Sequence, residues 1–199
     1  MFDGILPKRL PAEMSAMKRR VSIADEALGI PDSERRAWDV FRASAALNAQ
    51  ARGVVAEKVV RAVMGGDRVC SSEDRGDMLL NGRHCEIKSG FSSGKMNIRQ
   101  VRPWQDADYV VIHVNVEDRE ACRAWRLTHD QMMAEVKKHG SVSHGTAGAV
   151  ALNANKEYSL TISRGPRSAI GTRWDADYRD SALEALLFRS PPRLVDLVL

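Results

Sequence analysis

The chain has 199 residues, of which 44% are hydrophobic and 28% charged, and it carries a net charge of +4 with a pI near 9.1. This length allows one sizeable core, and the mild basic excess suits an anionic partner such as nucleic acid. No apolar run approaches membrane length, and the N-terminus lacks the features of a signal peptide. Cys70, Cys85 and Cys122 have no paired spacing, so we expect reduced thiols in a cytoplasmic protein without a zinc site.

The first third of the chain is predicted to be helical. Residues 11–28 are rich in Ala, Met and Lys, and Gly29 ends this segment. Residues 32–64 repeat apolar side chains on one helical face, with Gly53 expected to separate two helices and Gly65 to stop the second. These segments predict an N-terminal helical extension that leads into the rest of the fold.

The remainder alternates between short strands and helices. Strands are predicted at residues 68–71, 77–80, 84–88, 108–116, 124–127 and 157–162. Thr128 and Gln131 form a capping box that opens a helix to about Lys138, and a last helix is predicted at residues 181–188. Between them, GSVSHGTAGA is expected to be a loop with a possible DNA contact. We find no repeat and no clear linker, which favours one α/β domain with a central sheet.

The candidate active site lies on a predicted hairpin. Side chains alternate along a strand, so Glu86 and Lys88 share one face while the residues beside them face the core. The Asn81-Gly82 pair predicts a tight turn, which brings Asp77 toward Glu86 and Lys88 from the neighbouring strand. Two carboxylates and a lysine are therefore expected to converge.

These residue types suit metal-assisted hydrolysis. Asp77 and Glu86 offer the oxygen ligands that Mg²⁺ prefers, and a bound Mg²⁺ could polarise a phosphodiester and activate a water molecule. Lys88 could orient that water and offset charge on the phosphorus. A surface salt-bridge cluster would use the same residue types, and Glu73 or Asp74 would replace Asp77 if the strand register differed.

Gly76-Asp77 followed by Glu86-Ile87-Lys88 resembles the PD-(D/E)XK motif of restriction endonucleases, resolvases and repair nucleases. Gly76 stands where the motif has a loosely kept Pro. The resemblance covers about residues 52–113 and implies a restriction-endonuclease-like central mixed sheet flanked by helices. It also implies that Asp77 and Glu86 bind Mg²⁺, with Mn²⁺ as a substitute, and that Lys88 assists the water. We expect a single nuclease domain over residues 1–199, comprising a helical region (1–50), a catalytic core (51–116) and a completing part with possible DNA-recognition loops (117–199).

A third carboxylate precedes the motif. Glu57 lies on the helix that leads into the first strand. Many nucleases of this family have a helical Glu that faces the site, so the resemblance implies that Glu57 is a further metal ligand. The alternative is an exposed Glu57 paired with Arg61 one turn later.

A basic segment follows the motif. Residues 89–102 contain Lys95, Arg99 and Arg102 and no acidic residue. We predict a glycine-rich loop and a helix or turn here, in which the backbone and the arginines approach phosphates. Gln100 could reach the active centre or a base edge. A solvated surface loop is the alternative interpretation.

The sequence therefore predicts a Mg²⁺-dependent endonuclease that cuts double-stranded DNA and most resembles a type II restriction enzyme. Such enzymes usually act as homodimers, for which the N-terminal helices or the apolar tail, residues 194–199, could supply a surface. A companion DNA methyltransferase is a possible partner. The alternatives are a structure-selective resolvase, repair or mobile-element nuclease, and a catalytically inert DNA-binding protein of the same fold.

Overall fold

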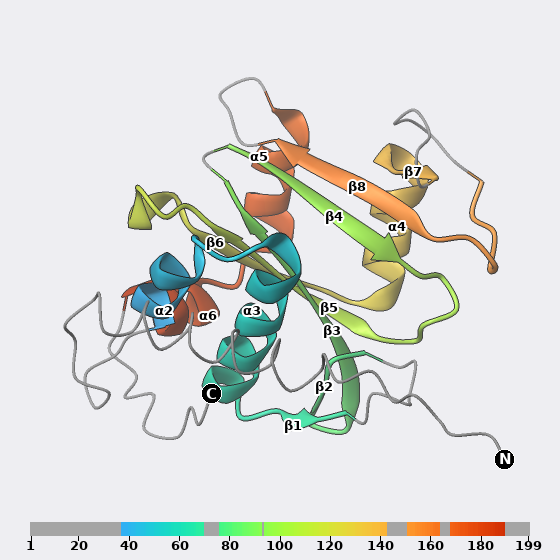
Figure 1. Cartoon of the computed structure of the whole chain (residues 1–199). Helices are drawn as coiled ribbons and strands as arrows, with labels where there is room; N and C mark the ends of the chain where they lie inside the picture. The colour runs from blue at the N-terminus through green and yellow to red at the C-terminus, as the bar shows by residue number, and fades with distance from the viewer. Residues whose placement is uncertain (1–36, 70–75, 93, 143–150, 164–167, 190–199) are drawn as a thin grey trace, which may run out of the picture.

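A mixed five-stranded sheet forms the centre of the protein (Figure 1). The computed structural model describes residues 37–69, 76–92, 94–142, 151–163 and 168–189. The strand order is β1–β2–β3–β5–β6, in which β3 and β5 run parallel and the other neighbours are antiparallel. The strands are β1 (Asp67–Arg68), β2 (Met78–Leu80), β3 (Arg83–Phe91), β5 (Asp108–Val114) and β6 (Arg123–Leu127).

Helices cover one face of this sheet. Figure 1 shows α3 lying across the strands, with α2 and α6 beside one another. The elements are α2 (Ala37–Ser44), α3 (Ala49–Met64), α6 (Ser181–Glu184) and the π-helical turn η3 (Ala185–Arg189). They bury one apolar core against the sheet, which includes Phe41, Val59, Ile87, Ile112 and Phe188. Burial of these side chains is the main force that holds α3 on the sheet.

A second, smaller sheet covers the opposite face. It has the antiparallel order β4–β8–β7, and the helices α4 and α5 pack with it. These elements are β4 (Lys95–Val101), β7 (Ser141–Val142), β8 (Tyr158–Ser163), α4 (His129–His139) and α5 (Ala169–Asp177). The core on this side contains an edge-to-face contact between Trp125 and Trp174, with ring centroids 5.7 Å apart. The central sheet is thus buried on both faces, as in an α/β fold.

The break between the first two helices lies at Asn48 and not at Gly53. The Asn48 side chain accepts a hydrogen bond from the backbone N–H of Ala51 at 2.9 Å and caps α3, whereas Gly53 lies inside that helix. An N-cap residue supplies an acceptor that the first helical turn needs, and a single glycine weakens a helix without ending it. Gly65 does end α3, in the left-handed conformation with φ 69°.

Within the described residues, the other predicted elements are confirmed except in the basic segment. The expected strands match β1, β2, β3, β5, β6 and β8 with shifted ends, and the capping box of α4 is formed. The predicted loop at residues 89–102 is wrong, because β3 continues to Phe91 and β4 follows from Lys95. A short 3₁₀ turn, η2 (Arg119–Ala121), precedes β6, and the last helix divides into α6 and η3.

Several predictions lie outside the described residues. These are the helix at 11–28, most of the GSVSHGTAGA loop, the alternative ligands Glu73 and Asp74, and the apolar tail at 194–199. Among the described helices, none combines the length and apolar character that crossing a membrane requires.

Candidate active site

The β2–β3 hairpin brings Asp77 to the backbone between Glu86 and Lys88. The turn at Asn81-Gly82 has positive φ angles of 51° and 78°, as a two-residue hairpin requires. Asp77 then lies opposite β3, where its Oδ2 accepts a hydrogen bond from the N–H of Ile87 at 2.7 Å. The predicted approach of Asp77 to the Glu86-Ile87-Lys88 strand is therefore observed.

Gly76 is required by the backbone at this point. Its φ is 115°, a conformation that proline cannot adopt and that other residues with a side chain rarely adopt. A Cβ at this position would lie 2.8 Å from the carbonyl oxygen of Cys85. The same carbonyl accepts the N–H of Asp77 at 2.8 Å, so the absence of a side chain at Gly76 allows the two strands to close. The backbone therefore requires a glycine at position 76.

Glu86 and Lys88 form an ion pair on one face of β3. Lys88 Nζ lies 2.6 Å from Glu86 Oε1, and both side chains are largely buried. Cys85 and Ile87 point to the opposite face, into the core beneath α3. The predicted alternation is confirmed, but the burial of the pair does not match the alternative of an exposed salt-bridge cluster. Burial also strengthens the interaction between the two charges.

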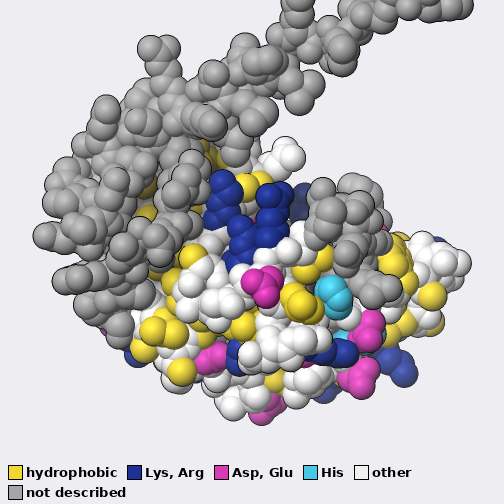
Figure 2. Space-filling model, turned by 90° about the horizontal axis from the view of Figure 1, so that it is seen from below, with side chains coloured by type: hydrophobic (Ala, Val, Ile, Leu, Met, Phe, Trp, Pro, Cys, Tyr) yellow, Lys and Arg dark blue, Asp and Glu magenta, His cyan; other side chains and the backbone are white. Residues whose placement is uncertain are grey.

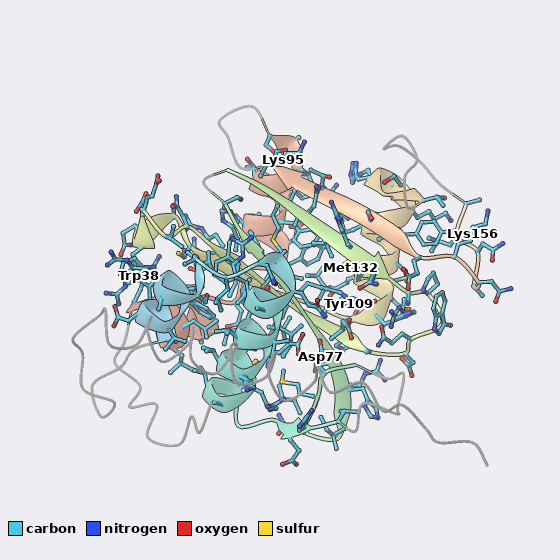
Figure 3. The ribbon with its side chains drawn as sticks, in the orientation of Figure 1. Trp38, Asp77, Lys95, Tyr109, Met132 and Lys156 are labelled. Atoms are coloured by element: carbon cyan, nitrogen blue, oxygen red, sulfur yellow. The ribbon has the colours of Figure 1, made fainter. Side chains whose placement is uncertain are left out.

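Glu57 belongs to the same charge cluster. Burial, together with the nearby charges of Asp77 and Glu86, raises the pKa of Glu57 to about 7. Burial and Glu86 likewise raise the pKa of Asp77 to about 6. Arg61, proposed as the partner of an exposed Glu57, lowers the Glu57 pKa less than Lys88 does. Figure 3 shows Asp77 beside α3, the helix that carries Glu57.

The chemistry of this cluster fits a hard divalent cation. Three carboxylates lie near one another with Lys88 as a close cation, and the pKa values of Glu57 and Asp77 are raised first by burial and then by repulsion from the neighbouring carboxylates. A cation would relieve that repulsion, and Mg²⁺ needs only one or two protein carboxylates because water supplies its other ligands. In the described part of the chain, no three His, Cys, Asp or Glu side chains are placed to enclose a metal ion by themselves.

Gln105 lies at the candidate site, although the sequence did not predict this position. It lies in the loop before β5, is only 3% exposed, and donates a hydrogen bond from Nε2 to Glu86 Oε2 at 3.1 Å. Both oxygens of Glu86 therefore accept a side-chain hydrogen bond, one from Lys88 and one from Gln105. The preceding residue, Trp104, is 42% exposed. Only the position of Gln105 just before an apolar strand could have suggested burial.

The four predicted DNA-binding residues fall into two groups. Lys95, Arg99 and Gln100 are exposed on β4, where a register shift between Ile98 and Val101 gives Gln100 a positive φ of 54°. Arg102 instead pairs with Glu157, with Nε 2.9 Å from Oε1. Figure 3 shows Lys95 at the end of β4 farther from Asp77. The structure therefore places these residues along one strand and its end and does not gather them around Asp77.

Basic side chains also gather on one face of the molecule. Figure 2 shows Lys and Arg side chains grouped near the centre of the face seen from below, next to an acidic side chain. Such a grouping suits a phosphate backbone.

A separate cavity of about 260 Å³ lies at the start of β3 and β5. Its lining includes Arg83, Asp108, Arg126 and Gln131, and excludes Asp77, Glu86 and Lys88. Arg83 there is paired with Asp108 at 3.4 Å. This cavity is distinct from the charge cluster.

Among the described residues, Ser92 and His113 form a Ser–His contact, but its hydrogen-bond direction does not suit a serine nucleophile. Ser92 Oγ donates to the carbonyl of Lys95 at 2.5 Å and lies 3.1 Å from His113 Nε2. A serine nucleophile must give its proton to the histidine, whereas this proton is directed to a backbone carbonyl. The pair links the end of β3 to β4 and β5.

No family model matches the chain, and no curated protein matches it in sequence.

Proposed function

We propose that this protein is a Mg²⁺-dependent endonuclease that hydrolyses phosphodiester bonds of double-stranded DNA. The observation that carries the proposal is the hydrogen bond from Ile87 N–H to Asp77 Oδ2, which places Asp77 beside Glu86 and Lys88. These three residues come from two strands and form a partly buried cluster with Glu57. The proposed fold is the restriction-endonuclease-like variant of the observed α/β architecture.

Each residue has a defined role in this proposal. Asp77 and Glu86 would hold the Mg²⁺, with Glu57 as a further oxygen ligand, and the bound ion would supply an activated water and polarise the scissile phosphate. Lys88 is held 2.6 Å from Glu86, where its ammonium group can orient the attacking water and offset charge on the phosphate.

The substrate surface in this proposal is the exposed side of β4. Lys95 and Arg99 would contact phosphates, and Gln100, displaced by the irregularity in β4, would contact a base edge or the site. Arg102 would contribute less charge, because Glu157 already neutralises it. Irregularities in a strand often occur beside active sites because they redirect side chains.

We further propose a cytoplasmic homodimer of the type II restriction class. Two copies would present two sites to the two strands of a duplex, which suits the closed symmetry of most homo-oligomers. An enzyme of this class would work with a companion DNA methyltransferase that protects the same sequence.

The direct test is incubation of supercoiled plasmid with the full chain in Mg²⁺, in Mn²⁺ and in EDTA. We expect cleavage with either metal, none in EDTA, and none for Asp77→Asn or Glu86→Gln in any buffer. Discrete fragments would support the restriction class, whereas cleavage limited to branched DNA would indicate a structure-selective nuclease.

Two results would contradict the proposal. Binding of DNA without cleavage in either metal would indicate an inert DNA-binding protein. Equal cleavage by the wild type and by Asp77→Asn would show a contaminating nuclease or a different site. Mapping the fragment ends on a sequenced plasmid would give the recognition sequence and the cut stagger.

A further inference from the structure

Gln105 contributes to the site with only one end of its side-chain amide. Nε2 donates to Glu86 Oε2 at 3.1 Å, whereas Oε1 is buried and has no hydrogen-bond partner among the described residues. The orientation of the amide follows from chemistry, since the reversed amide would place its oxygen against a carboxylate that accepts hydrogen bonds. An acceptor is therefore left without a donor.

Charged side chains lie at the other end of this amide. Glu86 lies at the other end of the amide and is itself held by Lys88 at 2.6 Å. Tyr109 is the partner of Glu86 on β5, and its hydroxyl oxygen is also buried. A buried acceptor without a donor is unfavourable, and in a polar interior its usual partner is a bound water molecule.

We propose that Gln105 is a positioning residue that fixes the Glu86 carboxylate through Nε2 and accepts a hydrogen bond from a bound water through Oε1. The inference rests on the proposed function, because the water would be a ligand of the Mg²⁺ held by Glu86. The amide oxygen can only accept, so it binds the water through a hydrogen and leaves the water's lone pair directed away from Gln105. Because the amide is neutral, it adds no further charge to the cluster of Glu57, Asp77 and Glu86.

The test measures Mn²⁺ binding without DNA, by electron paramagnetic resonance of the free ion. Gln105→Met keeps the length of the side chain and removes the amide. We expect it to weaken Mn²⁺ binding by about 10-fold, the lower end of the effect of residues that orient metal ligands. We also expect its melting temperature to fall slightly, because the buried Glu86 oxygen that Nε2 contacts loses its donor. Gln50→Met, at an exposed position on α3, is the matched control and should change neither measurement.

Glu86→Gln distinguishes a failure of the Gln105 role from a failure of the proposed metal site. If Glu86→Gln abolishes Mn²⁺ binding while Gln105→Met binds as wild type, the role of Gln105 is overturned and the metal site stands. If Glu86→Gln also binds as wild type, Glu86 holds no metal and the proposed function fails. A lower melting temperature with unchanged Mn²⁺ affinity in Gln105→Met would mean that Gln105 is only structural.

A second measurement uses the wild-type protein and does not depend on whether a variant folds. A crystal structure with Mn²⁺, at a resolution that shows ordered water, should contain a water molecule within hydrogen-bond distance of Gln105 Oε1. The inference would be overturned if Oε1 had no water molecule beside it or accepted a hydrogen bond from another protein group.

Discussion

Replacing Glu57 with Gln should make the metal-free protein more stable at alkaline pH. The Glu57 pKa is about 7 in the folded protein, against an ordinary value of 4.5, because of burial and the charges of Asp77 and Glu86. Below pH 4.5 the group is protonated in both the folded and unfolded states. Between pH 4.5 and 7 the folded state binds more protons, so the free energy of unfolding falls as pH rises. Above pH 7 the wild type holds a charged Glu57 beside Asp77 and Glu86, whereas the Gln variant does not.

The size of the effect follows from the pKa shift. The full shift of Glu57 corresponds to about 3 kcal/mol, and solvent screening of this half-buried side chain reduces the expected gain to about 1–2 kcal/mol. For a chain of this size, that gain raises the melting temperature by about 2–8 °C. Thermal unfolding followed by circular dichroism in EDTA should show this increase for Glu57→Gln at pH 8 and little difference at pH 5.

Two comparisons sharpen the experiment. Glu117→Gln, at an exposed position, should leave the difference in melting temperature between pH 5 and pH 8 as it is in the wild type. Mg²⁺ at pH 8 should stabilise the wild type more than Glu57→Gln, because the ion relieves a repulsion that the variant lacks. If Glu57→Gln were destabilised equally at both pH values, Glu57 would be a structural group and not a member of a strained charge cluster.

Four further predictions concern the candidate site and the proposed DNA surface. Asp77→Asn should abolish cleavage in Mg²⁺ yet retain DNA binding in Ca²⁺, measured by fluorescence anisotropy. A cleavage rate within about 10-fold of the wild-type rate would remove Asp77 from the mechanism. Lys88→Arg should keep the ion pair with Glu86 and the melting temperature but slow single-turnover cleavage roughly 100-fold or more, and a normal rate would leave Lys88 with only a structural role. Arg99→Ala should reduce the slope of DNA affinity against salt by about one charge, and Arg102→Ala by less, because Glu157 neutralises Arg102; equal slopes in all three proteins would exclude phosphate contacts. Gly76→Ala should lower the free energy of unfolding by about 1–3 kcal/mol in urea, whereas an unchanged value would show that the strand pair can shift to admit a Cβ.

The local part of the site is predictable from the sequence. Alternation along β3 separates Glu86 and Lys88 from the core residues, and the Asn81-Gly82 turn sets the pairing of β2 with β3. These signals act over a few residues, so no knowledge of the rest of the fold is needed to read them. The approach of Asp77 to β3 is predictable for the same reason, because it depends on the Asn81-Gly82 turn.

Long-range contacts explain what the sequence did not reveal. The segment with β4 looks like a loop because it begins near glycines and carries exposed polar residues, but its apolar residues face a core completed by β8 about 60 residues later. Arg102 looked like a free cation because Glu157 lies 55 residues away in sequence. Gln105 touches Glu86 only after β3 and β5 have paired.

The placement of the tryptophans gives the protein built-in optical reporters. Trp125 and Trp174 are fully buried and in contact, so their coupled near-ultraviolet circular dichroism will follow the packing of the second sheet. Trp104 is exposed and adjoins Gln105 in the chain, so it should emit at longer wavelength and respond to a metal ion or DNA at the site. The near-ultraviolet signal therefore reports the integrity of the core, and a ligand-dependent change in the long-wavelength emission would report binding at the proposed site, in one unlabelled sample.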